Sequence, residues 1–179
     1  MKPLELKLIC ALIKDSRRSD RELAKNLGVS QPTISRLRTK LEKDGLIREY
    51  TMLPDFRKIG FEIMAFTFYR LQKPLPPEQI EQIRTNILER ARQNPTAVII
   101  AMGGMGGLDA DRVVVSFHKD FSDYTVFLRD IRQIPQVIVA EPRSFLVDLG
   151  ADVHFYPLSF SRLADYVTRE SEDYNKNLP

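Results

Sequence analysis

Residues 30–45 constrain the fold more than any other stretch, because they have the pattern of a short amphipathic helix with a signal at each end. Ser30 suits the position before a first helical turn, where its hydroxyl accepts a hydrogen bond from a free backbone N–H. Pro32 fits that turn, because the N–H that it lacks would have no partner there. The apolar positions are Ile34, Leu37 and Leu41. Their spacings of three and four predict one buried stripe, and Gly45 can adopt the left-handed conformation that ends a helix.

The polar residues of this helix would face away from the stripe. Those that do so are Pro32, Ser35, Arg36, Thr39 and Lys43, with Lys40 at the flank. Gln31 and Thr33 lie near the helix N-terminus, with Ser30 just before them. Side chains of this kind can bond base edges and phosphates in a major groove. Arg36 and Thr39 are the leading candidates for base contacts, and Lys40 and Lys43 favour phosphates. The pattern alone also allows an ordinary solvated helix face.

Two further helices precede this one. Residues 4–13 have an inward apolar set, and Ser19 and Glu22 have the spacing of a capping box that starts a helix near Asp20. Gly28 ends that helix in a tight turn, which predicts a helix-turn-helix. Residues 46–52 alternate and are β-prone, so we expect a strand and turn there that form a wing.

The positive charge of the chain is concentrated near the N-terminus. Residues 1–60 carry 14 Lys and Arg against 8 Asp and Glu, whereas residues 61–179 carry 13 against 16. A basic small domain joined to a mildly acidic larger one is typical of a DNA-binding protein with a separate regulatory part. Arg17, Arg18 and Arg21 lie near the start of the second helix, where phosphate contacts would hold the third helix in register.

The segment RELAKNLGVSQPTISRLRTKLEKDGLI resembles the winged helix-turn-helix of the Lrp/AsnC family of transcription regulators. The resemblance lies in the Ala-x-x-Leu-Gly-Val-Ser run and in the exit Leu-Glu-x-x-Gly-Leu-Ile. It implies that the chain binds double-stranded DNA. Other winged-helix regulators share much of this pattern, so the remaining sequence must distinguish the family.

The second half predicts a βαββαβ unit, the ferredoxin-like order. The expected elements are strands at 61–71, 97–102, 112–118 and 137–149, and helices at 78–93 and 120–131. The fold class is therefore α+β. We expect a DNA-binding domain at 1–54, a linker at 55–60, the βαββαβ domain at 61–149 and an extension at 150–179.

A helix-turn-helix followed by βαββαβ matches the Lrp/AsnC family over about residues 3–149. The resemblance implies that the second domain senses a small, amino-acid-like effector. It also implies self-association, as a homodimer or a higher even-numbered oligomer.

Residues 103–107 contain four glycines, whose backbone N–H groups could approach a small anion. The family places its effector site beside the loop between the second and third strands. The resemblance therefore makes Gly103, Gly104, Gly106, Gly107 and Asp109 candidates for effector binding. A flexible hairpin connection is the alternative.

No catalytic or metal-binding set is evident in the sequence. His118 and His154 lack metal-ligand spacing, and Cys10 fits a small core residue in a reducing cytoplasm. We expect no cofactor and no membrane segment. Two alternatives share this architecture: an enzyme resembling sirohaem decarboxylases, and a ligand-sensing scaffold that does not bind DNA. The apolar residues beyond 150 predict that the extension packs on a neighbouring subunit.

Overall fold

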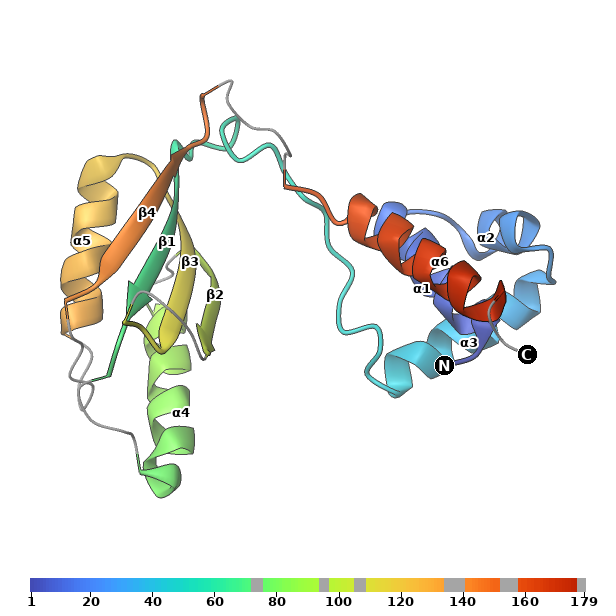
Figure 1. Ribbon diagram of the computed structural model, residues 1–179, viewed down its shortest axis with the longest axis horizontal. Coiled ribbons are helices and arrows are strands. Elements are labelled where there is room, and N and C mark those ends of the chain that lie inside the picture. Colours follow the sequence, from blue (N-terminus) through green and yellow to red (C-terminus); the bar gives the residue numbers. More distant parts are fainter. Residues whose placement is uncertain (72–75, 94–96, 105–108, 134–140, 152–157, 177–179) are drawn as a thin grey trace. The chain divides into compact units, whose positions relative to one another are not determined.

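The structure is a computed structural model that describes residues 1–71, 76–93, 97–104, 109–133, 141–151 and 158–176. It consists of two compact units, which are described separately (Figure 1). The first unit contains residues Met1–Leu53 and His154–Pro179, and the second contains Pro54–Val153. The chain therefore leaves the first unit, builds the second and returns to the first.

The first unit contains α1 (Pro3–Lys14), α2 (Asp20–Leu27), α3 (Gln31–Lys43) and α6 (Ser161–Lys176). The predicted first three helices are confirmed. Their buried core consists of Leu8, Leu12, Leu23, Ala24, Ile34 and Leu41. The stripe that the sequence predicts on α3 is therefore the side that packs against α1 and α2.

Local signals fix where α2 and α3 begin and end. The Ser19 hydroxyl accepts a hydrogen bond from the Glu22 N–H, and the Glu22 carboxylate accepts one from the Ser19 N–H at 2.8 Å. The Ser19 hydroxyl also donates a hydrogen bond to the Glu22 carboxylate at 2.7 Å. The bonds that this carboxylate accepts from the Ser19 hydroxyl and N–H hold the pKa of Glu22 below its ordinary value. Gly28 and Gly45 have φ angles of 69° and 71°, the left-handed conformation expected at these ends.

The predicted strand over residues 46–52 does not form, and this prediction is wrong. Residues 48–55 have no regular secondary structure. An isolated β-prone segment needs a neighbouring strand to satisfy its backbone, and no strand occurs among the described residues of this unit. Side chains provide contacts instead: Tyr50 donates a hydrogen bond to Glu42 at 2.7 Å, and Ser16 donates one to the Thr51 carbonyl.

Helix α6 packs against α1 of the same unit (Figure 1). Lys14 of α1 lies 2.5 Å from Asp165 of α6, and Ala164 is fully buried. This arrangement differs from the sequence-based prediction, which placed the extension on a neighbouring subunit.

The second unit is a four-stranded antiparallel sheet with two helices. Its elements are β1 (Ile63–Tyr69), α4 (Pro77–Gln93), β2 (Val98–Gly103), β3 (Arg112–His118), α5 (Phe121–Arg132) and β4 (Arg143–Asp148). The strand order is β2-β3-β1-β4, which is the predicted βαββαβ arrangement. The last strand begins later than predicted, and residues 137–140 of that prediction lie outside the described part of the chain.

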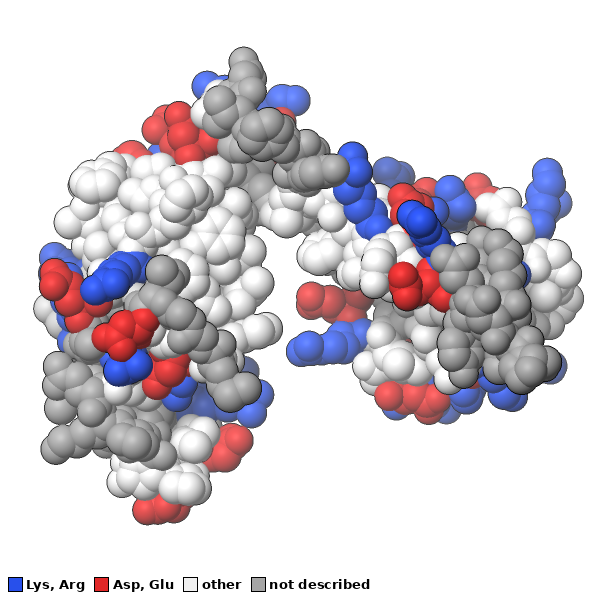
Figure 2. Space-filling model, in the orientation of Figure 1, with Lys and Arg blue, Asp and Glu red and all other residues white. Residues whose placement is uncertain are grey.

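The two faces of the sheet differ in their surroundings. Ser116 and His118 of β3 are buried on the face that α5 covers, where the His118 ring lies 5.0 Å from the ring of Phe127. On the other face, Phe66 pairs with Val115 on one side and with Phe145 on the other. The Phe145 side chain is 66% exposed. We call this second surface the open face. In the view of Figure 2, charged residues are sparse over much of the second unit.

Candidate nucleic-acid interface and effector site

The outer side of α3 carries three exposed side chains that can contact DNA. They are Arg36, Thr39 and Lys43. Neither Arg36 nor Lys43 makes an ion pair with any residue that the structure describes. Because the opposite side of α3 is fixed in the core, this outer side is held rigidly while its donors stay available.

The first turn of α3 is closed by its own side chains. The Ser30 hydroxyl accepts a hydrogen bond from the Thr33 N–H at 3.3 Å and lies 2.7 Å from the Thr33 hydroxyl. Gln31 and Pro32 are exposed, and Ser35 is half-buried. The predicted residues of this turn therefore lie at one end of the exposed side, with Ser30 and Thr33 also serving as the helix cap.

Lys40 differs from Arg36 and Lys43, although the sequence grouped it with Lys43. Its ammonium lies 2.6 Å from the carboxylate of Glu5 and 3.4 Å from that of Asp44. Glu5 could not be identified as a partner from the sequence, because the two residues are far apart along the chain. The only local signal was the three-residue spacing from Lys2 to Glu5, which is that of a helix cap.

Arg38 has a structural role that was not expected from the sequence. Its guanidinium lies 2.8 Å from the carboxylate of Asp20, donates a hydrogen bond to the Arg18 carbonyl at 3.2 Å, and lies 5.6 Å from the centre of the Tyr50 ring. The sequence did contain a signal of this role: Arg38 follows Ile34 by four positions, and residues four apart face the same side of a helix. An arginine on a buried stripe usually has a charged partner.

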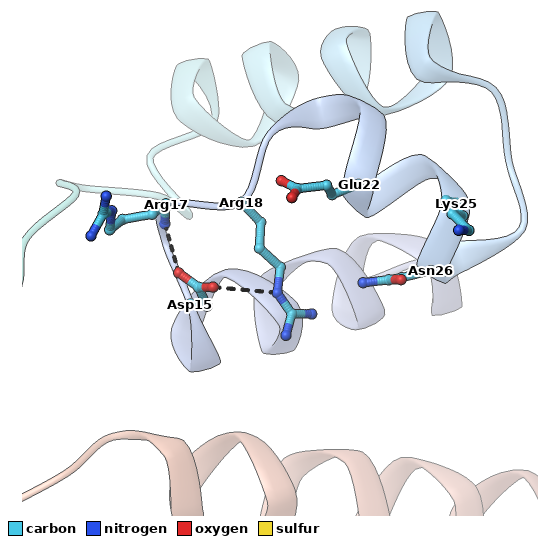
Figure 3. A pocket seen from close by; sticks show the side chains of 6 residues that line it. All are labelled: Asp15, Arg17, Arg18, Glu22, Lys25 and Asn26. Atoms are coloured by element: carbon cyan, nitrogen blue, oxygen red, sulfur yellow. Dashed lines mark hydrogen bonds and ion pairs between the residues drawn. The ribbon is translucent and has the colours of Figure 1, made fainter.

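A cavity of about 530 Å³ lies beside the turn between α1 and α2 (Figure 3). It is lined by Asp15, Arg17, Arg18, Glu22, Lys25 and Asn26. The Asp15 carboxylate accepts a hydrogen bond from the Arg17 N–H at 3.0 Å and lies 3.5 Å from the Arg18 guanidinium. Of the three arginines predicted to contact phosphates, Arg18 is therefore partly neutralised by Asp15. Arg17 and Arg21 are exposed and have no ion pair within the described ranges.

Basic side chains project from several edges of this unit in Figure 2, with acidic side chains among them. The unit therefore does not have one continuous positive surface on the side that this figure shows. Attraction for a phosphate backbone depends on which cations lack a carboxylate neighbour. Because Lys40 has carboxylate neighbours, Arg36 and Lys43 are better candidates than Lys40 for phosphate contacts.

The predicted effector residues lie near one end of the sheet. Gly103 is the last residue of β2, and the Gly104 N–H donates a hydrogen bond to the Asp111 carbonyl at 2.9 Å. This bond occupies one of the several backbone N–H groups that were expected to face a ligand. Gly106 and Gly107 lie outside the described residues.

Asp109 lies beside a cavity of about 330 Å³ in the second unit. The cavity is lined by Phe68, Tyr69, Arg70, Asp109, Glu141, Pro142 and Arg143. The Asp109 carboxylate lies 2.7 Å from the Arg70 guanidinium, and burial raises the pKa of the Tyr69 hydroxyl. The cavity thus offers two cationic and two anionic groups around aromatic side chains. Gly103 and Gly104 are not among its lining residues.

Two other features can be described for the part of the chain that the structure covers. No cluster of three or more His, Cys, Asp or Glu residues that could hold a metal ion is found there. None of the helices described is long and apolar enough to cross a bilayer. Cys10 is a buried free thiol, and His154 lies outside the described residues.

Comparison with known proteins matches residues 1–48 to a winged helix-turn-helix DNA-binding family. An uncharacterized HTH-type transcriptional regulator of Pyrococcus abyssi is 29% identical over 134 residues, which cover 75% of this chain and 84% of the relative. The regulatory protein AsnC of Haemophilus influenzae is 36% identical over 63 residues, covering 35% of this chain and 42% of that protein. LrpC of Bacillus subtilis is 37% identical over 60 residues, covering 34% and 42%.

Solved structures share the fold. An AsnC family transcriptional regulator from Agrobacterium tumefaciens has a TM-score of 0.68 at 21% identity, covering 91% of this chain and 99% of that chain. A transcriptional regulator of Neisseria meningitidis in complex with L-Met has a TM-score of 0.67 at 20% identity, with the same coverage. These relatives are named as transcriptional regulators or regulatory proteins. By its helix-turn-helix, its βαββαβ unit and these relatives, the chain is similar to the Lrp/AsnC family of transcription regulators.

Proposed function

We propose that this regulator binds duplex DNA through the outer side of α3, with Arg36 and Thr39 at base edges and Lys43 at a phosphate. The observation that carries the proposal is the exposure of these side chains on a helix whose other side is fixed in the core. Arg17 and Arg21 supply further phosphate contacts beside α2. The first turn of α3, with Gln31, adds backbone and side-chain donors there.

The test of this proposal is a titration of the full-length protein with its operator DNA, selected from genomic fragments by affinity. Arg36→Ala is expected to weaken operator binding by about 1–3 kcal/mol, as for the loss of a bidentate contact with guanine. Arg132→Ala, which removes one exposed arginine from α5 of the other unit, is the matched control. Equal affinities for Arg36→Ala and wild type would refute the assignment of Arg36.

The open face supports a second element of the proposal, self-association as a homodimer. Phe145, Met102 and Ile100 are exposed apolar residues on this face. An apolar surface of this kind on a sheet is typical of an interface between subunits. A dimer would present two copies of α3 to two half-sites of an operator.

A small amino-acid-like effector completes the proposed function. The cavity beside Asp109 offers carboxylates for an ammonium group and arginines for a carboxylate. The L-Met complex of the Neisseria meningitidis relative supports this class of ligand. An effector that binds one arrangement of the paired subunits more tightly would shift the population toward it and change the affinity for the operator.

Calorimetric titration of the protein with the common amino acids tests the effector. A binding isotherm for one of them that is lost in Asp109→Asn supports the site. Arg129→Gln, an exposed change on α5 away from this cavity, serves as the control. Heat signals that are the same in Asp109→Asn and wild type would place the ligand elsewhere.

A further inference from the structure

A charged contact joins the first turn of α1 to the C-terminal half of α3. The Lys40 ammonium lies 2.6 Å from one carboxylate oxygen of Glu5. The Glu5 side chain is only 7% exposed, whereas that of Lys40 is 54% exposed. Lys40 therefore reaches from the surface of α3 to a carboxylate that the fold has largely removed from water.

The other oxygen of Glu5 is also occupied. It accepts a hydrogen bond from the Lys2 N–H at 2.8 Å, which caps the first turn of α1. The bonds from Lys40 and Lys2 hold the pKa of Glu5 below its ordinary value, and the bond to Glu5 raises the pKa of Lys40. Both groups are thus charged at neutral pH, and the carboxylate cannot turn away from Lys40 without losing the cap.

A second carboxylate lies on the other side of the Lys40 ammonium. Asp44 is 3.4 Å away, so the group of Glu5, Lys40 and Asp44 has a net charge of −1. A DNA phosphate near Lys40 would meet two carboxylates together with one ammonium. Lys43 lies less than one turn further along α3, is exposed and has no ion pair among the residues described.

We infer that Glu5 is a positioning residue that holds Lys40 within the fold and thereby excludes it from the phosphate contacts of α3. The cationic part of the DNA-contacting surface on α3 then consists of Arg36 and Lys43, while Lys40 ties α3 to α1. This inference rests on the proposed DNA-binding function and replaces the phosphate role that the sequence suggested for Lys40.

The number of phosphate contacts can be counted from salt dependence. Each cation that neutralises a phosphate contributes about 0.9 to the slope of log affinity against log salt concentration. Affinity for a mixed-sequence DNA duplex is measured over a range of salt concentrations for wild type, Lys40→Met and Lys43→Met. We expect the slope to be unchanged in Lys40→Met and to fall by about 0.9 in Lys43→Met.

Glu5→Gln gives the complementary measurement. The amide oxygen of glutamine can still accept the Lys2 N–H, but the negative charge beside Lys40 is gone. Without the Glu5 carboxylate, Lys40 can contact a DNA phosphate, so we expect the slope to steepen by up to about 0.9. A role confined to stability would lower the melting temperature of Glu5→Gln and leave the slope as in wild type, which would overturn the inference.

The ways in which the inference could fail are distinguishable. A wild-type affinity that does not depend on salt would contradict the proposed DNA binding itself. A normal wild-type slope that falls by about 0.9 in Lys40→Met would contradict only the role of Glu5. If Lys40→Met does not fold, Lys40→Gln removes the same charge with a polar side chain and is read in the same way.

Discussion

The guanidinium of Arg38 lies 2.8 Å from the carboxylate of Asp20, so two arginines of the same helix have different uses. Arg38 joins α3 to the first turn of α2, and its side chain is only 19% exposed. Its Nε atom is buried and has no hydrogen-bond partner among the described residues. Arg36, two positions earlier, remains at the surface. Stability and DNA affinity should therefore respond to different arginines.

Arg38→Met is expected to lower the free energy of unfolding by about 1–3 kcal/mol, because it leaves the carboxylate of Asp20 and the Arg18 carbonyl without a partner. Methionine keeps most of the apolar stem, so the change tests the charged contacts. Urea unfolding measures the effect. The same substitution at exposed Arg36 is the control and should remain within about 0.5 kcal/mol of wild type. Equal losses in the two variants would contradict the bracing role of Arg38.

A pH-dependent contribution to stability is expected from His118. Burial lowers the pKa of His118 from its ordinary value of 6.5, and the nearby carboxylate of Asp123 partly opposes this effect. The unfolded chain therefore binds a proton at a higher pH than the folded chain does. The resulting stability is present above about pH 6.5 and is lost as the pH falls through the folded pKa.

Unfolding measured from pH 7.5 down to about pH 5 in wild type and His118→Asn tests this expectation. The stability advantage of wild type over the variant should shrink as the pH falls. Carboxylates titrate in both proteins and cancel in the difference. An advantage that stays constant over this range would show that His118 does not cause the pH dependence.

A single charge on the open face should disrupt self-association. Phe145→Glu places a carboxylate next to Phe66 of β1 on this apolar face, and burying it at an interface is costly. Phe121→Glu is the matched control, because Phe121 is 63% exposed, close to the 66% of Phe145, but lies on α5. Sedimentation analysis is expected to show a dimer for Phe121→Glu and a monomer for Phe145→Glu. Two proteins of the same mass would place the interface elsewhere.

Helix α6 is expected to stabilise the unit that contains α3. Ala164→Glu would force a charge into a fully buried position and lower the free energy of unfolding by about 2–3 kcal/mol. Leu163→Glu, at a neighbouring exposed position, is the control. Light scattering on both variants separates this role from the alternative that α6 holds subunits together. Loss of oligomer mass with unchanged stability in Ala164→Glu would favour the alternative.

The sequence predicts the elements well where the determining contacts are local. The bond between Ser19 and Glu22 spans three residues, and the positive φ at Gly45 depends on that residue itself. For the same reason, the amphipathic pattern of α3 distinguishes its buried side from its exposed side. Alternation likewise predicts three of the four strands to within about two residues.

Contacts between distant residues could not be predicted in the same way. Glu5 and Lys40 come into contact only when α1 packs against α3. The helical pattern of either segment therefore cannot predict their ion pair. The strand expected over residues 46–52 failed because β-propensity cannot supply a neighbouring strand. The two cavities likewise depend on turns whose geometry the sequence leaves open.

The return of the chain to α1 has a consequence for biosynthesis. A nascent polypeptide emerges from the ribosome in order, so α1, α2 and α3 are complete long before α6 is made. The side of α1 that α6 covers must wait, uncovered, until the whole sheet-bearing unit has been translated. Premature termination after the sheet would therefore release a chain in which α1, α2 and α3 are complete but the side of α1 that α6 covers stays exposed.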